Sequence, residues 1–223
     1  MITIYKGISV AKRIFVTATN TDIGKTYTTL KLLRHYTDAG YRVGAIKPIE
    51  TGVTEYPLDG SALLATLQEL NPAFSHMRVG DIVPVQFELP AAPYVASGGA
   101  AIDFDRIEQA FAAVEPLCDI LIIEGAGGLL VPVDKDHMIV DLIRRFRARA
   151  LLVSHCRLGC INDTLLNMAF MDQAGIDYSW VINCRSSDQE AFERISAPYL
   201  RGRFENVYTL ENNLDQLAAE LLK

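Results

Sequence analysis

Residues 13–39 read RIFVTATNTDIGKTYTTLKLLRHYTDA, and this stretch decides the fold. Its first five residues form a short apolar run that predicts a β-strand, and Lys25–Ala39 predicts a helix that stops at Gly40. The polar loop between them ends in Gly-Lys-Thr. Such a loop between a strand and a helix is typical of phosphate binding, because backbone N–H groups and the helix N-terminus surround phosphate oxygens.

Two side chains of this loop have the chemistry to hold a nucleotide. Lys25 can reach the β and γ phosphates, and the Thr26 hydroxyl can ligate Mg²⁺. The common G-x-x-x-x-G-K-T spacing places a first glycine at position 19, where Thr19 stands instead. The plain alternative is an ordinary strand–turn–helix with a surface lysine, which the context of the loop and its Gly-Lys-Thr end disfavour.

Apolar, β-rich runs alternate with helical segments along the rest of the chain. Further strands are expected at Arg42–Lys47, Ile82–Phe87, Asp119–Glu124, Ala150–Ser154, Tyr178–Asn183 and Asn206–Leu210. Further helices are expected at Asp59–Leu70, Asp103–Glu115, Met138–Phe146, Ile161–Ala174 and Asn213–Leu222, with Ala91–Ala101 as a loop. The inner runs are continuously apolar, as parallel strands covered on both faces are. We therefore predict an α/β fold with a doubly wound, mainly parallel sheet and helices on both faces, similar to P-loop NTPases.

The length and charge of the chain narrow its class. We expect 223 residues to form a single domain, with Met1–Lys12 as an extra edge strand or a flexible leader. A net charge of −6 gives no nucleic-acid footprint. No apolar run reaches the ~18 residues of a membrane span, and the N-terminus lacks the apolar core of a signal peptide. We expect a cytoplasmic protein that binds neither nucleic acid nor membrane.

The cysteines fit a reducing compartment. They are Cys118, Cys156, Cys160 and Cys184. None forms a C-x-x-C pair and three lie in or beside apolar runs, so we expect buried free thiols.

Two other predicted strands end in residues suited to phosphate chemistry, and ligands of such sheets bind at the carboxyl ends of the strands. One strand ends in Glu124-Gly-Ala-Gly-Gly128, where the acid suits Mg²⁺ and the glycines let backbone approach a ligand. Another ends in Lys47-Pro-Ile-Glu-Thr51, which brings a second lysine to the crevice of Lys25. Taken singly, these are also consistent with a tight glycine turn and with a surface lysine before proline.

Four segments, in this order, resemble dethiobiotin synthetases, enzymes of the biotin pathway. The segments are ATNTDIGKT (18–26), KPIETG (47–52), EGAGGLLVP (124–132) and LGCIN (158–162). The family's phosphate loop has one more residue than the standard form and begins with a small residue, as Ala18 to Gly24 does here. The resemblance spans Ile14 to about Asn183.

The resemblance implies an ATP- and Mg²⁺-dependent ligase. It forms the cyclic urea of dethiobiotin from 7,8-diaminopelargonate and CO₂, through a carbamate and a carbamic–phosphoric anhydride. The resemblance also implies a homodimer with its sites at the subunit interface.

The same resemblance implies a role for each matching residue. Lys47 and Lys25 are the catalytic pair. The nucleotide-binding residues are Asn20, Thr21, Asp22, Ile23, Gly24, Lys25, Thr26, Tyr27 and Asn183, the last as the adenine-reading amide. The substrate-binding residues are Thr21, Lys47, Thr51, Gly127 and Gly128, together with Gly159, Cys160 and Asn162, which receive the substrate carboxylate from the neighbouring subunit. The metal ligands are Thr26, Asp59 and Glu124.

The chain departs from the family pattern at two places. The acidic ligand at the start of the helix after the second strand is assigned to Asp59, although an alignment with Ser61 at that position stays open. The segment Asn206–Asn213 has no Gly or Pro, where many members form a loop over the base, so looser base selectivity is expected.

Two other protein classes share the phosphate loop but fit the sequence less well than the ligase. A glutamine-dependent amide ligase of the cobyrinate type carries a glutaminase domain, for which 223 residues leave no room. A nucleotide-switch ATPase of the partitioning or septum-positioning class has a signature lysine where Asn20 stands, and usually a basic C-terminal helix. The C-terminal segment Leu214–Lys223 is acidic here.

Overall fold

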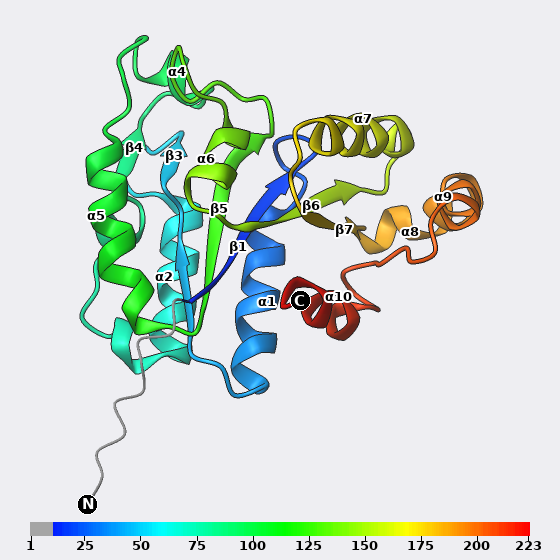
Figure 1. The fold of residues 1–223 in the computed structure, drawn as a ribbon, viewed down its shortest axis with the longest axis horizontal. Coiled ribbons are helices and arrows are strands. Elements are labelled where there is room, and N and C mark those ends of the chain that lie inside the picture. Colours follow the sequence, from blue (N-terminus) through cyan, green and yellow to red (C-terminus); the bar gives the residue numbers. More distant parts are fainter. Residues whose placement is uncertain (1–10) are drawn as a thin grey trace, which may run out of the picture.

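A computed structural model describes residues 11–223, which form a parallel five-stranded sheet flanked by helices (Figure 1). The strand order is β2-β5-β1-β6-β7, and every neighbouring pair is parallel. The strands are β1 (Lys12–Ala18), β2 (Val43–Ile46), β5 (Ile120–Gly128), β6 (Arg149–His155) and β7 (Tyr178–Asn183). A separate parallel pair joins β3 (Ile49–Thr51) and β4 (Val85–Phe87). The predicted fold class is confirmed.

The helices connect the strands and pack against the sheet, which buries the apolar residues of the strands. They are α1 (Lys25–Asp38), α2 (Leu58–Leu70), α3 (Val79–Ile82), α4 (Pro93–Ala96), α5 (Phe104–Val114), α6 (Ile139–Arg145), α7 (Cys160–Gln173), α8 (Ser186–Ile195), α9 (Ala197–Arg203) and α10 (Leu214–Leu221), with short 3₁₀ turns at Pro72–Phe74 and Glu115–Leu117. Helix α1 packs against α2, α10 and the central strands, whereas α6 contacts β5 and α7 contacts β6. Helices α8 and α9 lie at the β7 end of the sheet and cover a second, smaller apolar cluster (Figure 1).

The register of the sheet brings three strand ends to one edge. Val16 pairs with Glu124, and Ile46 pairs with Ile123, so the residue after Ile46 stands level with Glu124. Strand β1 leads directly into the loop before α1. The phosphate loop, Lys47 and Glu124 therefore meet at the carboxyl edge of the sheet.

Several expected elements differ from the structure. The expected strand Asn206–Leu210 is wrong: its only ladder contact is a bridge from Thr209 to Ile182, at the exposed side of β7. The expected strand Ile82–Phe87 shortens to β4, which pairs with β3 outside the main sheet. Helices α8 and α9 were not predicted, and the expected loop Ala91–Ala101 contains the single turn of α4. The expected leader or edge strand lies outside the described residues except for its last two.

The expectation of four free thiols is also wrong. Cys156 and Cys184 form a disulfide, while Cys118 and Cys160 are buried free thiols. The pairing follows from the sheet: His155 lies opposite Asn183 in the β6–β7 register, so the two cysteines that follow these residues are neighbours. Cysteine spacing alone cannot reveal such a pair, because it depends on which strands lie side by side.

The described residues offer nothing that could span a bilayer. None of the helices between residues 11 and 223 combines the necessary length with the necessary apolar character.

Candidate functional site

Lys47 lies at the centre of a buried cluster of charges. Its ammonium nitrogen is 2.7 Å from Glu124 Oε1 and 2.9 Å from Asp59 Oδ2. The Thr26 hydroxyl donates a hydrogen bond to the same Glu124 oxygen at 2.8 Å. Lys47 is 3% exposed and Glu124 is fully buried, so this lysine is no surface residue. The structure thus brings together the predicted metal ligands and one of the two predicted catalytic lysines.

The charges in this cluster shift one another. Burial lowers the pKa of Lys47, but the Glu124 and Asp59 carboxylates outweigh burial and raise it overall. Burial raises the pKa of Asp59, yet the Lys47 ammonium, together with Thr26 and Lys25, holds it below its ordinary value. The pKa of Lys25 is lowered, first by burial and then by the like charge of Lys47. Lys47 is therefore protonated and Asp59 ionised at neutral pH.

Glu50 fixes the helix that carries Asp59. Its carboxylate, 5% exposed, accepts hydrogen bonds from the backbone N–H groups of Asp59 at 3.0 Å and of Gly60 at 2.9 Å. These are first-turn amides of α2, where a negative charge is stabilised by the helix dipole. Burial raises the pKa of Glu50 in spite of these hydrogen bonds. Glu50 lies within the KPIETG segment, but the sequence pattern predicts no role for it.

The cluster has the oxygen donors that Mg²⁺ prefers. Glu124 Oε2 is buried without a hydrogen-bond partner in the described structure, and Thr26 and Asp59 add a hydroxyl and a carboxylate. One or two carboxylates with phosphate oxygens and waters suffice for octahedral Mg²⁺. No group of three or more His, Cys, Asp or Glu between residues 11 and 223 could hold a metal alone. The donor set fits an ion that is bound largely through a nucleotide.

A pocket of about 930 Å³, here called the reaction pocket, opens onto this cluster. Its lining includes the predicted residues Thr21, Asp22, Gly24, Lys25, Thr26, Lys47, Thr51, Asp59 and Gly127. Gly128 lies deeper, where β5 packs closely against the backbone of the phosphate loop. Segments far apart in sequence therefore converge on one pocket, as the motifs predict.

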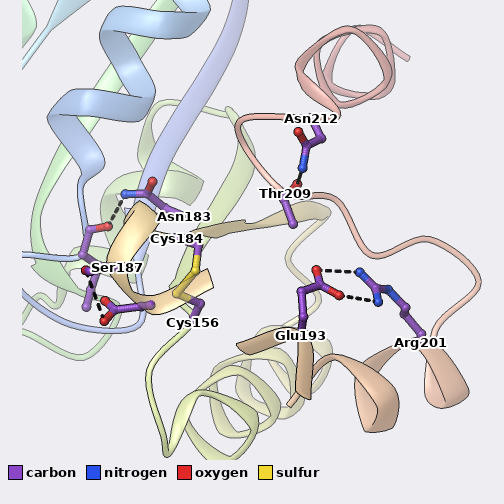
Figure 2. The surroundings of a disulfide bond; sticks show 10 residues. Cys156, Asn183, Cys184, Ser187, Glu193, Arg201, Thr209 and Asn212 are labelled. Atoms are coloured by element: carbon purple, nitrogen blue, oxygen red, sulfur yellow. Dashed lines mark hydrogen bonds and ion pairs between the residues drawn. A yellow bond between two sulfur atoms is a disulfide. The ribbon is translucent and has the colours of Figure 1, made fainter. Parts of the chain in front are cut away.

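A second pocket of about 790 Å³, here called the base pocket, lies on the other side of the phosphate loop. Asn183, Tyr27 and Ile23 line it, together with the disulfide cysteines and the start of α8. Figure 2 shows the disulfide beside Asn183, where β7 leads into α8. Both volumes lie within the range of about 300–1,000 Å³ that is usual for small-molecule sites.

Gly24 allows Asn183, at the end of β7, to pack closely against the phosphate loop. Its φ of 96° lies in the left-handed region, and a Cβ there would come within 2.2 Å of Asn183 Nδ2. The Asn183 amide donates to the carbonyl oxygen of Ile23 at 2.8 Å. The end of β7 is thereby locked onto the phosphate loop, with the other side of the amide left for a ligand.

The remaining predicted substrate residues lie elsewhere in the chain. Gly159, Cys160 and Asn162 form the start of α7 and line neither pocket. Cys160 is fully buried, so in one chain it presents no surface to a ligand. Two large apolar side chains near them face solvent: Leu158 is 86% exposed and Leu166 is 63% exposed. Within one chain this segment does not join the reaction pocket.

One residue of the base pocket gave no signal in the sequence. Glu211 accepts hydrogen bonds from the Tyr27 hydroxyl at 2.7 Å and from the Lys31 ammonium at 2.6 Å. It ties the C-terminal turn to α1 at the rim of the base pocket. A single acid in an irregular segment has no motif to mark it.

Comparison with known sequences gives consistent results. A family model described as an AAA domain matches residues 12–213. The chain is 41% identical to the ATP-dependent dethiobiotin synthetase BioD of a Sulfurovum species, with 93% of this chain and 99% of that protein covered. It is 36% identical to the ATP-dependent dethiobiotin synthetase BioD of Wolinella succinogenes, covering 95% of this chain and 98% of that protein. The corresponding protein of Aquifex aeolicus is 35% identical, over 82% of this chain and 80% of its own.

Comparison with solved structures concerns the fold alone. The MinC:MinD cell division complex of Aquifex aeolicus matches with a TM-score of 0.53 at 13% identity, covering 94% of this chain and 86% of that chain. A plasmid partition protein of Borrelia burgdorferi bound to AMPPNP matches with a TM-score of 0.50 at 9% identity, covering 90% of this chain and 86% of that chain. This cell division protein and this partition protein thus share the architecture, whereas sequence identity of 35–41% lies with the dethiobiotin synthetases.

Proposed function

The chain belongs to the dethiobiotin synthetase family, and from that premise we propose how its residues carry out the ATP-dependent ligase reaction. Its activity is ATP-dependent dethiobiotin synthesis. The substrates proposed with ATP are 7,8-diaminopelargonate and CO₂. One amine takes up CO₂ as a carbamate, whose oxygen attacks the γ-phosphorus of ATP, releasing ADP and forming a carbamic–phosphoric anhydride. The second amine then closes the ring and expels phosphate.

The observation that carries the division of roles is the buried position of Lys47 between two carboxylates. Phosphoryl transfer to a carbamate brings two anions together, so fixed positive charge is the main requirement. Lys47 and Lys25 both line the reaction pocket. We propose that Lys47 stabilises the carbamate and that Lys25 binds the β and γ phosphates. Because Asp59 and Glu124 hold Lys47 in place, its charge needs no rearrangement when the reaction starts.

The proposed metal ligands are Thr26, Asp59 and Glu124. Bound Mg²⁺ would neutralise phosphate charge and help to orient the γ-phosphate. One Glu124 oxygen is engaged by Thr26 and Lys47, and the other has no partner among residues 11–223, which supports a role for Glu124 as a metal ligand. Glu50 is proposed as a positioning residue, since it holds the amide of Asp59.

The proposed assembly is a homodimer with its sites at the interface. In one chain, Gly159, Cys160 and Asn162 are separate from the reaction pocket. This separation is consistent with a role in binding substrate at the reaction pocket of a second chain. The exposed Leu158 and Leu166 flank these residues and would be covered in such a dimer.

The test is phosphate release from ATP and Mg²⁺, with each substrate omitted in turn. Release should require both diaminopelargonate and bicarbonate, because the carbamate is the phosphoryl acceptor. Diamine-independent hydrolysis that responds to lipid or DNA would instead place the protein among the switch ATPases. The dimer is tested separately by sedimentation, with Leu166→Asp as the variant expected to dissociate it.

A further inference from the structure

The two pockets share a narrow boundary. Three residues line both of them: Asp22 and Gly24 of the phosphate loop, and Arg185 on the opposite side. The family resemblance implies that the adenine lies beside Asn183, and the proposed function puts the γ-phosphate beside Lys25. A nucleotide bound in this way must pass its phosphate chain across this boundary.

Arg185 is the cationic residue at the boundary. The base pocket has Arg157 and Arg185, and the reaction pocket has Lys25, Lys47 and Arg185, so among the lining residues it alone places positive charge in both. The Asp22 carboxylate on the facing loop would repel phosphate. A cation at this boundary offsets that repulsion.

The Arg185 guanidinium is free for a ligand. The side chain is exposed and, within residues 11–223, has no hydrogen-bond or ion-pair partner. Most other arginines in this part of the chain are paired, as Arg201 is with Glu193 at 2.7 Å in the same C-terminal segment (Figure 2). An unpaired arginine at the boundary between two pockets contributes nothing evident to the fold.

The backbone of Arg185 is held more firmly than its side chain. The preceding residue, Cys184, is bonded to Cys156, and Asn183 is hydrogen-bonded to the phosphate loop. The Arg185 carbonyl accepts the N–H of Asp188 in the first turn of α8. A fixed backbone with a free guanidinium lowers the entropy lost on binding, and the planar fork of arginine matches phosphate oxygens.

We propose that Arg185 binds the phosphate chain of ATP where it crosses from the base pocket to the reaction pocket. This inference rests on the proposed function, since it takes the placement of ATP from it. It adds a phosphate contact from outside the phosphate loop, supplied by the segment after β7. The contact is with phosphate and so is independent of the base.

The experiment compares Arg185→Ala, Arg185→Lys and Arg157→Ala by competition of ATP, ADP and adenosine against a fluorescent ATP analogue. Arg157→Ala is the matched control, because it removes the same charge from the base pocket only. Arg185→Ala should weaken ATP and ADP about 10-fold or more, the scale of a charge-assisted hydrogen bond, and leave adenosine unchanged. Arg185→Lys should recover part of the loss. Arg157→Ala should change ATP affinity less than about threefold, because only the screened long-range attraction of one positive charge is lost.

Two results would overturn the inference. One is unchanged ATP affinity in Arg185→Ala with thermal unfolding like that of the parent protein. The other is an equal loss in Arg157→Ala, which is what a general field effect produces. Neither result affects the proposed function, because diamine- and bicarbonate-dependent phosphate release is measured on the unaltered chain.

Discussion

The reaction pocket and the base pocket lie on either side of one loop but are built differently. The reaction pocket takes its charges from the ends of β2 and β5 and the starts of α1 and α2, and the central pair of Lys47 and Glu124 is buried. The base pocket takes its lining from the sheet edge, the start of α8 and the C-terminal turn. Tyr27 in its lining is 46% exposed, and the Cys156–Cys184 disulfide is part of the same lining.

The difference separates two requirements of catalysis. Charges that stabilise a transition state must be fixed before the reaction, because rearrangement at that moment raises the barrier. A pocket that only holds a base can tolerate exposed and adjustable side chains. We therefore expect substitutions in the reaction pocket to lower kcat, and substitutions in the base pocket to raise the KM for ATP or to lower stability.

Lys47→Ala should produce the largest change in activity. The loss of one charge-stabilising contact slows turnover by about 10²-fold or more, while ATP binding through Lys25 and the phosphate loop stays nearly intact. The measurement is steady-state kcat together with the Kd for ATP. Lys135→Ala is the control, since that side chain is 76% exposed.

Removal of Lys47 also leaves Glu124 buried without its cation, which can destabilise the fold. Lys47→Arg preserves the charge and allows for this, and it should still be slow because a guanidinium differs in shape from an ammonium. A Lys47→Arg enzyme with normal kcat would show that charge alone is sufficient. Near-normal turnover in folded Lys47→Ala would remove Lys47 from the mechanism.

Loss of the disulfide should be the next largest effect, on stability and not on chemistry. Cys156 and Cys184 are 28 positions apart, and a loop of that length gives about 3.6 kcal/mol of unfolding free energy in the chain-entropy treatment. Cys156→Ser should therefore lower the denaturation midpoint and raise the KM for ATP, with kcat at saturating ATP close to normal. Denaturant unfolding and a KM–kcat comparison measure both.

The variant supplies its own control. A reductant should destabilise the unaltered protein by the same amount and leave Cys156→Ser unchanged. Disulfides are rare in reducing compartments, and in such a compartment the stability that matters is that of the reduced form. Equal stability with and without reductant would mean that the disulfide contributes nothing to the fold.

The metal ligands allow a finer test within the reaction pocket. Asp59→Asn should raise the Mg²⁺ concentration needed for half-maximal turnover by about 10-fold. This is the lower end of the loss in metal affinity that follows when the residues around a bound metal are changed. Ser61→Ala should change it little, because Ser61 does not line the reaction pocket. Mg²⁺ titrations of the two variants decide between them. The opposite pattern would mean that the alignment of this segment is displaced by two residues.

The sequence could predict the reaction pocket because its residues lie in strand ends and loops with motifs. The segments containing Lys25, Lys47 and Glu124 each follow an apolar run, and parallel strands bring such ends together. The burial of Lys47 could not be predicted, since it depends on the ion pairs that compensate for it.

Most of the base pocket could not be predicted from the sequence. Asn183 was identified through the family resemblance, but Arg185, Glu211 and the disulfide partners depend on contacts between distant segments. The failed strand at Asn206–Leu210 has the same origin. Its apolar residues suit a strand, yet only Thr209 finds a bridge partner at the sheet edge.

Glu211→Gln should give the smallest effect, and it tests how much the base pocket depends on its rim. Glu211 bonds Tyr27 and Lys31 of α1, but its side chain is 48% exposed. Exposed ion pairs contribute about 0–1 kcal/mol, so the KM for ATP should rise by less than about fivefold with kcat unchanged. Glu69→Gln is the matched control, because Glu69 pairs with Arg34 of the same helix and lines neither pocket. A second measurement is base selectivity, given by kcat/KM for ATP divided by kcat/KM for GTP. If the rim selects the base, the ratio falls in Glu211→Gln and stays constant in Glu69→Gln. A fall in kcat of tenfold or more in Glu211→Gln would contradict the separation of the two pockets, because it would mean that a contact in the base pocket affects the chemical step.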